Sequence, residues 1–101
     1  GMDIAAPGGT PIHAAAAGRV IRAGYNGGYG NYTCISHGSG LSTCYGHQSA
    51  IGVHVGEYVR RGEVIGRVGT TGASTGYHLH FETRVRGVPK NPVRYLPSCL
   101  C

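Results

Sequence analysis

The residues best suited to chemistry lie in one stretch near the C-terminal end, GYHLHFE at residues 76–82. Successive side chains of a β-strand point to opposite faces, so His78, His80 and Glu82 would share one face, and the leucine and phenylalanine between them the other. Two imidazoles on alternate residues lie about 6 to 7 Å apart and can converge on a metal ion and its water. A surface His-X-His pair without a ligand role is also compatible with this stretch, so the rest of the chain must decide.

The composition predicts a turn-rich β protein. The chain has 101 residues, enough for one domain with a core, and it contains 19 glycines and only 13% charged residues. A helical bundle would need many more charged residues and leucines at helical spacing. We therefore expect an all-β fold, a compact antiparallel β-sheet with loops that wall a groove, in one domain over residues 1–95. A cysteine-containing tail would follow at residues 96–101.

Alternation and turn residues place the other expected elements. An extended entry and a Pro-Gly turn precede the first long strand, and a loop with four glycines and two tyrosines, which could stack on a ligand or pack on the sheet, covers residues 24–30. Residues 68–76 form a second loop that feeds into the His-X-His strand. The expected strands are residues 13–16, 19–23, 32–37, 41–47, 49–55 with His54 on an edge, 64–66, and 76–85.

The hairpin of residues 32–37 and 41–47 allows two of the four cysteines to be paired. With residues 38–40 as its turn, His37 opposes Leu41 and Cys34 opposes Cys44. Directly opposed Cα atoms lie about 4.5 to 5.5 Å apart, within disulfide reach, so we predict a Cys34–Cys44 bridge. The bridge indicates an oxidising compartment outside the cytoplasm. The two remaining cysteines are either free or paired outside this chain, namely Cys99 and Cys101.

In this register the disulfide occupies one face of the hairpin, and both hairpin histidines occupy the other. His47 then sits opposite Asn31 at the open end, whereas His37 sits near the turn, about 20 Å away along the strand. The two histidines cannot serve one site, so we expect His37 to be structural. The predicted shared face comprises Asn31, Thr33, Ile35, His37, Leu41, Thr43, Tyr45 and His47.

The charge suggests an anionic partner. The net charge is +5 with neutral histidines and the sequence pI is about 9.3, which suits a bacterial cell wall or a nucleic acid. The basic residues are scattered without an aromatic-rich basic patch, so we expect no nucleic-acid partner. No apolar run approaches the roughly 18 to 20 residues of a membrane span, and no signal peptide is present, so we expect no integral membrane segment and a mature or excised piece.

Five phrases recur here in the order of a known family. They are Asp3 before Ala-Ala-Pro-Gly, Tyr45-Gly46-His47, Val59-Arg60-Arg61-Gly62, Ser74-Thr75-Gly76, and the stretch from His78 to Glu82. Together they resemble the M23 family of zinc metallopeptidases, the lysostaphin-like or LytM-type domain. The resemblance extends from Gly1 to about Tyr95, so it implies a peptidoglycan endopeptidase fold for nearly the whole chain.

The resemblance implies a role for four residues. Asp3 and His80 would be ligands of a Zn²⁺ cofactor, and His47 and His78 the catalytic histidines. Zinc with three protein ligands lowers the pKa of a water toward about 7, and an imidazole beside it can take a proton or protonate a leaving amine. Which histidine does which stays open. Glu82 either orients a ring or forms an ordinary salt bridge to an arginine such as Arg84.

The resemblance also implies a substrate and a location. It indicates hydrolysis of peptidoglycan peptides, in the cross-bridge or the stem, by an extracellular, periplasmic or wall-associated protein. We expect a monomer or a part of a longer secreted protein.

One departure from the family pattern concerns the metal. The family motif places another zinc-binding histidine two residues before Gly1, outside this sequence. Catalytic zinc sites usually keep three protein ligands, so the chain as printed would be inactive or metal-free. It is then either a truncated piece of an active enzyme or a degenerate, non-catalytic module that binds walls or activates wall hydrolases. Because the four functional residues are all present, we expect the truncated enzyme.

Overall fold

The computed structural model describes residues 2–72, 76–86 and 88–90. The expected tail at residues 96–101, the domain end at residue 95, and the pairing of Cys99 and Cys101 lie outside the described residues. Ser74 and Thr75 of the family phrase also lie outside them. Among the described residues, no helix has the length and apolar character that a membrane-spanning helix requires.

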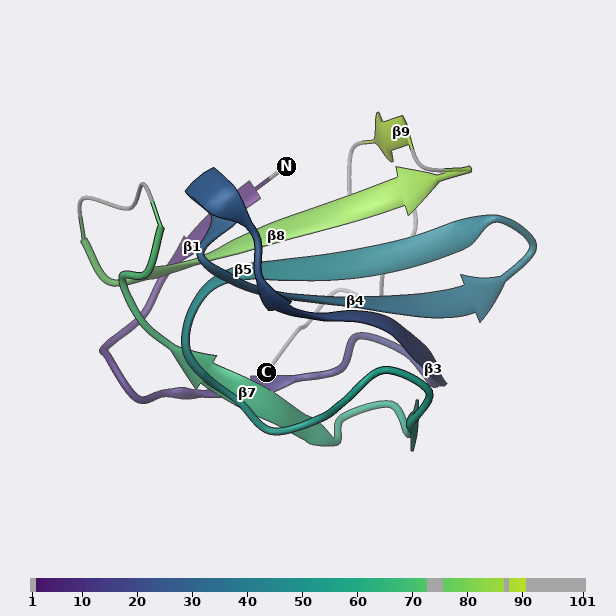
Figure 1. The fold of residues 1–101 in the computed structure, drawn as a ribbon, viewed down its shortest axis with the longest axis horizontal. Helices are drawn as coiled ribbons and strands as arrows, with labels where there is room; N and C mark the ends of the chain where they lie inside the picture. Colours follow the sequence, from purple (N-terminus) through teal and green to yellow (C-terminus); the bar gives the residue numbers. More distant parts are fainter. Residues whose placement is uncertain (1, 73–75, 87, 91–101) are drawn as a thin grey trace.

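The described chain is an all-β fold, as predicted (Figure 1). Its one helical element there is a short 3-10 turn, η1 (Gly27–Tyr29). All strand pairs of the described chain are antiparallel, with the order β1-β8-β5-β4-β3-β6, while β7 pairs with both β2 and β5, and β9 pairs with β8. The strands are β1 (Met2–Ala5), β2 (Pro11–His13), β3 (Gly18–Tyr25), β4 (Asn31–Gly38), β5 (Leu41–Ile51), β6 (Tyr58–Val59), β7 (Val64–Val68), β8 (His78–Val85) and β9 (Val88–Lys90).

Strand β8 is held between β1 and β5, and its alternation is the one predicted from sequence. Leu79 and Phe81 are buried, at 8% and 0% exposure, in the main core with Tyr45 and Ile65. The Phe81 ring meets the Tyr45 ring edge to face, with centroids 5.3 Å apart. The opposite face of β8 is therefore left for the polar side chains at alternate positions.

Strand β5 is longer than predicted and pairs with different strands at its two ends. Its first part pairs with β4 and β8, and its end, at residues 48–51, pairs with β7, so the strand curls from one side of the molecule to the other (Figure 1). The expected edge strand at residues 49–55 is therefore wrong beyond Ile51. Gly52 leaves the strand, Val53 enters the core, and His54 lies exposed before a turn.

The hairpin of β4 and β5 confirms the predicted disulfide but not the predicted register at its two ends. Cys34 pairs with Cys44 in register and is bonded to it. At the turn, Gly38 rather than His37 opposes Leu41, and at the open end Gln48 rather than His47 opposes Asn31. A β-bulge at each end causes these shifts, because an extra residue on one strand moves every later pair by one.

Candidate metal and catalytic site

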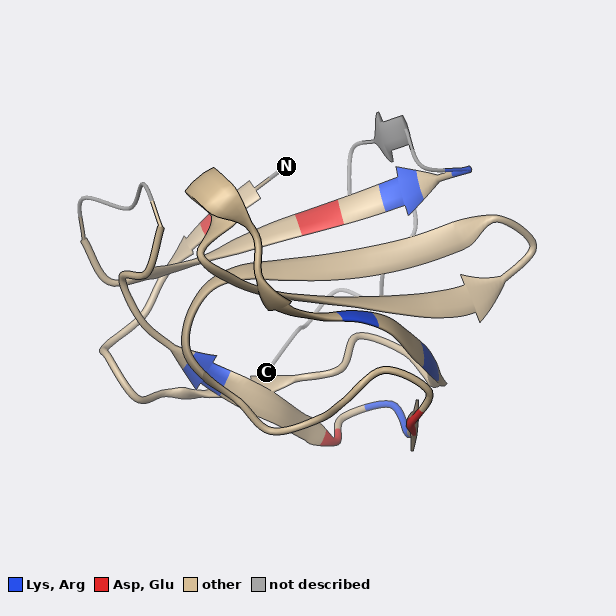
Figure 2. Ribbon diagram, in the orientation of Figure 1, with Lys and Arg blue, Asp and Glu red and all other residues tan. Residues whose placement is uncertain are grey.

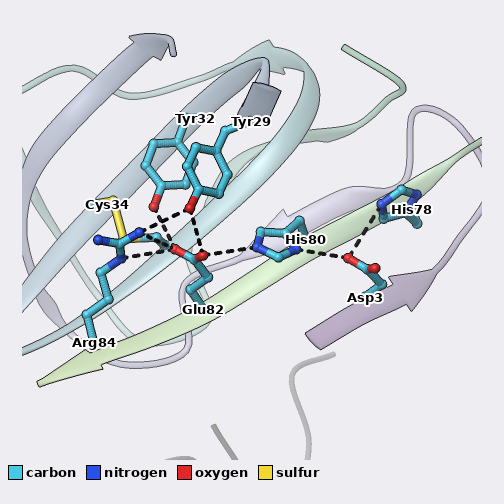
Figure 3. Close-up of polar contacts among 9 residues, drawn as sticks. Asp3, Tyr29, Tyr32, Cys34, His78, His80, Glu82 and Arg84 are labelled. Atoms are coloured by element: carbon cyan, nitrogen blue, oxygen red, sulfur yellow. Dashed lines mark hydrogen bonds and ion pairs between the residues drawn. A yellow bond between two sulfur atoms is a disulfide. The ribbon is translucent and has the colours of Figure 1, made fainter. Parts of the chain in front are cut away.

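The site begins where β1 and β8 pair, with Asp3 directly opposite His80. The oxygen Oδ1 of Asp3 lies 2.9 Å from Nδ1 of His80 and 3.5 Å from Nε2 of His78 (Figure 3). The hydrogen bond with His80 lowers the pKa of Asp3 below its usual value, against a smaller opposing effect of burial, and a positive charge on His78, His80 or His47, when one of these rings is protonated, acts in the same direction as the hydrogen bond. One carboxylate oxygen and two ring nitrogens therefore meet at one point.

Glu82 stands behind this point as a buried carboxylate, only 5% exposed. Its Oε2 lies 3.1 Å from Nε2 of His80 and accepts from the Tyr29 hydroxyl at 3.1 Å. Its Oε1 accepts from Tyr32 at 2.8 Å and from Nε of Arg84 at 3.0 Å (Figure 3). Both interpretations left open by the sequence hold, since Glu82 contacts the histidine ring and also forms a salt bridge with Arg84.

The electrostatics of Glu82 follow from these contacts. Burial acts to raise the pKa of the carboxyl group, but hydrogen bonds from His80, Tyr32 and Arg84 outweigh burial and lower the pKa to about 2. The Tyr32 pKa is raised by burial and by its bond to the carboxylate. Glu82 is therefore a fixed negative charge behind His80 throughout the range in which proteins usually work.

The ring of His80 is flanked by two carboxylates, and this arrangement indicates whether a cation would fit beside the ring. A neutral imidazole has one N–H, so it can donate to Asp3 or to Glu82 but not to both. If Glu82 takes the proton of Nε2, the lone pair of Nδ1 faces the Asp3 oxygen, and two acceptors at 2.9 Å require a cation or a second proton beside them. Ligand histidines commonly donate their other nitrogen to a carboxylate in this manner.

The same donors fit a zinc ion. Zinc bonded to nitrogen and oxygen at about 2.0 to 2.2 Å in a tetrahedron has ligand atoms about 3.3 Å apart. The Asp3–His80 pair, at 2.9 Å, is near that spacing. The described residues contain no group of three or more His, Cys, Asp or Glu side chains arranged to hold a metal, so this pair offers two ligands and not a complete site.

His47 reaches the site by a different route. Strict alternation along β5 would send its side chain to the core face with Tyr45, and the predicted shared hairpin face is wrong at this position. The bulge adds one residue to β5, since Gln48 opposes Asn31 while Tyr45 opposes Thr33, and His47 adopts a φ of 60°. Bulges re-aim side chains in this way.

The ring of His47 consequently lies beside the two histidines of β8. Its centroid is 4.8 Å from that of His78 and 5.9 Å from that of His80. Its Nδ1 donates to the carbonyl of Thr71 at 2.7 Å, and Nδ1 of His78 donates likewise to the carbonyl of Gly76 at 3.1 Å, because a carbonyl can only accept. In its neutral form, each ring therefore presents Nε2 as the nitrogen that can accept a proton.

Gly46 lies close to Tyr29 and His80, where there is little room for a side chain. A Cβ atom there would lie 3.3 Å from the carbonyl oxygen of Tyr29 and 3.4 Å from Cβ of His80, tighter than or at the limit of ordinary contact. A side chain before His47 would therefore require β8 or the 3-10 turn to move by a few tenths of an ångström.

The four residues singled out from the sequence are thus brought together. Asp3, His47, His78 and His80 meet at the end of a hollow of about 250 Å³ lined by Gly28, Tyr29, His47 and His80, which we call the histidine hollow. His37 lies elsewhere, with its nitrogens 2.8 Å from the carbonyl of Ala17 and 2.7 Å from Thr43 Oγ1. It has the structural role expected of it.

Sequence analysis missed two tyrosines of the site. Tyr29 of the glycine-rich loop stacks on Tyr32, with ring centroids 4.4 Å apart and planes 18° apart, and both hydroxyls bind Glu82. Tyr25, the other loop tyrosine, is 69% exposed. The available signal was Tyr32, which precedes Cys34 by one strand period and so shares its face.

The chain is similar to known proteins along nearly its whole length. Residues 1–92 match peptidase family M23. The chain belongs to that family. It is 54% identical over 93 residues to the DD-carboxypeptidase/endopeptidase Mpg of Neisseria meningitidis, covering 92% of this chain and 21% of that protein. It is also 47% identical over 92 residues to the peptidoglycan DD-endopeptidase ShyC of Vibrio cholerae, covering 91% and 21%. The chain therefore spans about a fifth of the length of these two relatives.

The chain is also similar to a third relative and to two solved structures. Lipoprotein NlpD of Yersinia enterocolitica is 45% identical over 97 residues, covering 95% of this chain and 99% of that protein. A zinc-containing peptidase from Vibrio cholerae superposes with a TM-score of 0.90 at 41% identity, covering 96% of this chain and 30% of that one. The catalytic domain of lysostaphin from Staphylococcus simulans gives 0.87 at 34% identity, covering 92% and 74%. The predicted family and the lysostaphin-like fold are confirmed.

Proposed function

We propose that this chain is the catalytic domain of a zinc-dependent endopeptidase that hydrolyses peptide bonds of peptidoglycan. Membership of peptidase family M23 and likeness to a DD-carboxypeptidase/endopeptidase and to a peptidoglycan DD-endopeptidase support the reaction class. The observation that carries the proposal is the meeting of Asp3 Oδ1 with Nδ1 of His80 and Nε2 of His78, beside the ring of His47.

In this proposal Asp3 and His80 are metal ligands. Zinc, when bound, would lower the pKa of a water molecule and polarise the carbonyl of the substrate. Glu82 holds the Nε2 proton of His80, so that Nδ1 keeps its lone pair for the metal. The third ligand of the family pattern falls two residues before Gly1, outside the printed sequence.

The other two histidines would move protons. Backbone carbonyls hold the Nδ1 protons of His47 and His78, so each Nε2 can accept a proton from the attacking water. The imidazolium formed can then give that proton to the nitrogen of the leaving amine as the C–N bond breaks. The ring that does not take the proton would stabilise the charge that develops on the carbonyl oxygen.

We also propose that the protein works outside the cytoplasm. The Cys34–Cys44 disulfide favours an oxidising compartment, and the similarity to a Yersinia lipoprotein and to a peptidoglycan DD-endopeptidase supports the cell envelope. The net charge of +5 suits an anionic wall polymer.

A metal and cleavage experiment tests this function. Elemental analysis would compare this chain with a lengthened version whose short upstream segment places the family's histidine two residues before Gly1, and both would be incubated with purified peptidoglycan. We expect stoichiometric zinc and release of peptide ends only in the lengthened version. If neither version holds zinc or digests peptidoglycan, the proposal fails and a non-catalytic wall-binding or hydrolase-activating module takes its place.

A single substitution then tests the roles. His78→Ala in the lengthened version is expected to abolish cleavage with zinc retained. Loss of zinc instead would mean that the ligand and the catalytic histidine of the His-X-His pair are exchanged.

A further inference from the structure

A second hollow lies on the same face of the sheet as the histidines and is larger, about 470 Å³. Small side chains on the two central strands form its floor, namely the Cys34–Cys44 disulfide, Ser36 and Ser42. Longer side chains on the flanking strands rise around that floor, with Arg22 on β3 and Arg84 on β8. We call this space the distal hollow.

The strand registers explain why these residues gather. Cys34 opposes Arg22 on one side and Cys44 on the other, and Cys44 opposes Glu82. Directly opposed residues share a face, so this row lies on the face of Glu82 and His80. Figure 2 shows the same arrangement, with basic positions on β3 and β8 flanking the uncharged strands β4 and β5.

The distal hollow and the histidine hollow share a wall. Tyr29 lines both of them. From His80 to Arg84 is four residues along β8, about 13 Å, which an extended peptide covers in about four residues. One peptide chain could therefore lie across the histidines and reach the distal hollow.

The distal hollow is electropositive. The only acidic side chain beside it among the described residues is Glu82, which already accepts from Arg84, Tyr32 and Tyr29. Arg22 is exposed and forms no ion pair within the described parts of the chain. Arg19, on the same strand, is different, because its guanidinium donates to the carbonyl of Gly56 and lies over the Tyr58 ring. Arg22 is therefore available to an anionic group.

We propose that the distal hollow binds a carboxylate of the peptide substrate, with Arg22 as the residue that recognises it and Arg84 as a second positive wall. A guanidinium suits this task because its planar N–H groups match the two oxygens of a carboxylate. The hydroxyls of Ser36 and Ser42 on the floor can donate to the same group. This inference rests on the proposed peptidase function and adds a specificity site about four residues from the cleaved bond.

The experiment uses two forms of one substrate. Peptide fragments released from purified peptidoglycan would be used directly, or after their carboxylates are converted to carboxamides with a carbodiimide and ammonia. Binding would be measured by calorimetry with the His78→Ala form of the lengthened chain, so that no cleavage occurs. The variant is Arg22→Ala, and the control is Arg61→Ala, which removes the same charge from an exposed position in the turn between β6 and β7.

We expect the protein with Arg22 and the Arg61→Ala control to bind the free carboxylates about 10-fold more tightly than the carboxamides, and Arg22→Ala to bind both forms alike. In the active lengthened chain, Arg22→Ala should raise KM for unmodified fragments and leave kcat near its original value. A carboxylate preference that persists in Arg22→Ala overturns the subsite. Equal cleavage of both forms by the unsubstituted enzyme also overturns it, while leaving the peptidase function in place; binding with the expected preference but without cleavage would overturn the peptidase function alone.

Discussion

Two histidines of this molecule reach the same place by different means. His80 is positioned by the plain period of strand β8, with Leu79 and Phe81 buried beneath it and Asp3 opposite it in register. His47 is positioned against the period of strand β5, by a bulge and a φ of 60°. The ring centroids nevertheless lie 5.9 Å apart.

The two ways of positioning a histidine suit the two roles that we propose for His80 and His47. In the roles we propose, His80 must hold a fixed distance to the metal as a ligand, and β8, which is held between two other strands, offers that rigidity. A bulge costs regular pairing but can turn a side chain out of the core toward a neighbouring strand. The site therefore combines His80 on a strand held from both sides, paired with Asp3 on the edge strand β1, with a histidine that a bulge turns in from the adjacent strand.

The largest expected effect distinguishes a histidine that binds zinc from a histidine that transfers a proton. In the lengthened chain, His80→Ala is expected to lose both zinc and cleavage, because a ligand is removed. His47→Ala is expected to keep its zinc and lose about 10³-fold in kcat/KM, because only proton transfer is impaired. Metal analysis and a peptidoglycan cleavage assay on the same samples measure both effects. Loss of zinc from His47→Ala would contradict the division of roles.

A second prediction concerns the buried support of β8. Phe81→Ala is expected to lower the free energy of unfolding by about 3 to 5 kcal/mol, since a fully buried ring leaves a cavity. The matched control is Tyr25→Ala, whose ring is 69% exposed and should cost less than about 1 kcal/mol. Denaturant unfolding of the two variants provides the measurement, and similar losses in both would show that the face beneath the histidines is not the core.

The sequence could predict β8 and the disulfide because both depend on simple periods. Alternating apolar and polar residues at 78–82 are visible in the letters, and a short turn places Cys34 opposite Cys44. The placement of His47 could not be found in that way, because an inserted residue and a positive φ leave no mark on an alternating pattern. The regular alternation of an ideal hairpin predicted His47 on the same face as Tyr45, which is wrong.

Other parts of the site depend on contacts between distant segments. Asp3 could be linked to His80 only through family resemblance, since no local pattern pairs residues 77 positions apart. The grouping of Tyr29, Tyr32 and Arg84 around Glu82 requires the packing of η1 onto the sheet. The composition indicated none of these contacts.

A third prediction concerns pH and the carboxylate behind His80. The pKa of Glu82 is lowered from 4.5 to about 2, so its contribution to stability is present above about pH 4.5 and is lost as the pH falls toward 2. In the metal-free protein, this contribution is of the order of 2 kcal/mol. Urea titrations between pH 6 and pH 2 should therefore show a smaller loss of stability on acidification for Glu82→Gln than for the unsubstituted protein. Glu63→Gln provides a charge-matched control, and a slope that Glu82→Gln leaves unchanged would refute the assignment.

The smallest expected effect concerns the backbone conformation at His47 and at His80. The free energy of unfolding of His47→Gly should be about 1 kcal/mol higher than that of His47→Ala, because φ is 60° at this position. At position 80, in a strand interior, alanine should be more stable than glycine by about 0.5 to 1 kcal/mol. Unfolding of His47→Gly, His47→Ala, His80→Gly and His80→Ala without metal tests this reversal of sign. The same sign at both positions would mean that no bulge holds His47.

The most direct test of the account is to locate zinc in the lengthened chain by anomalous X-ray scattering from crystals. We predict one peak at about 2.0 to 2.2 Å from an Asp3 carboxylate oxygen and from Nδ1 of His80, with His47 and His78 beyond bonding distance. A peak bonded to His78 or His47 in place of His80, or a crystal soaked in zinc that shows no peak between Asp3 and His80, would contradict it.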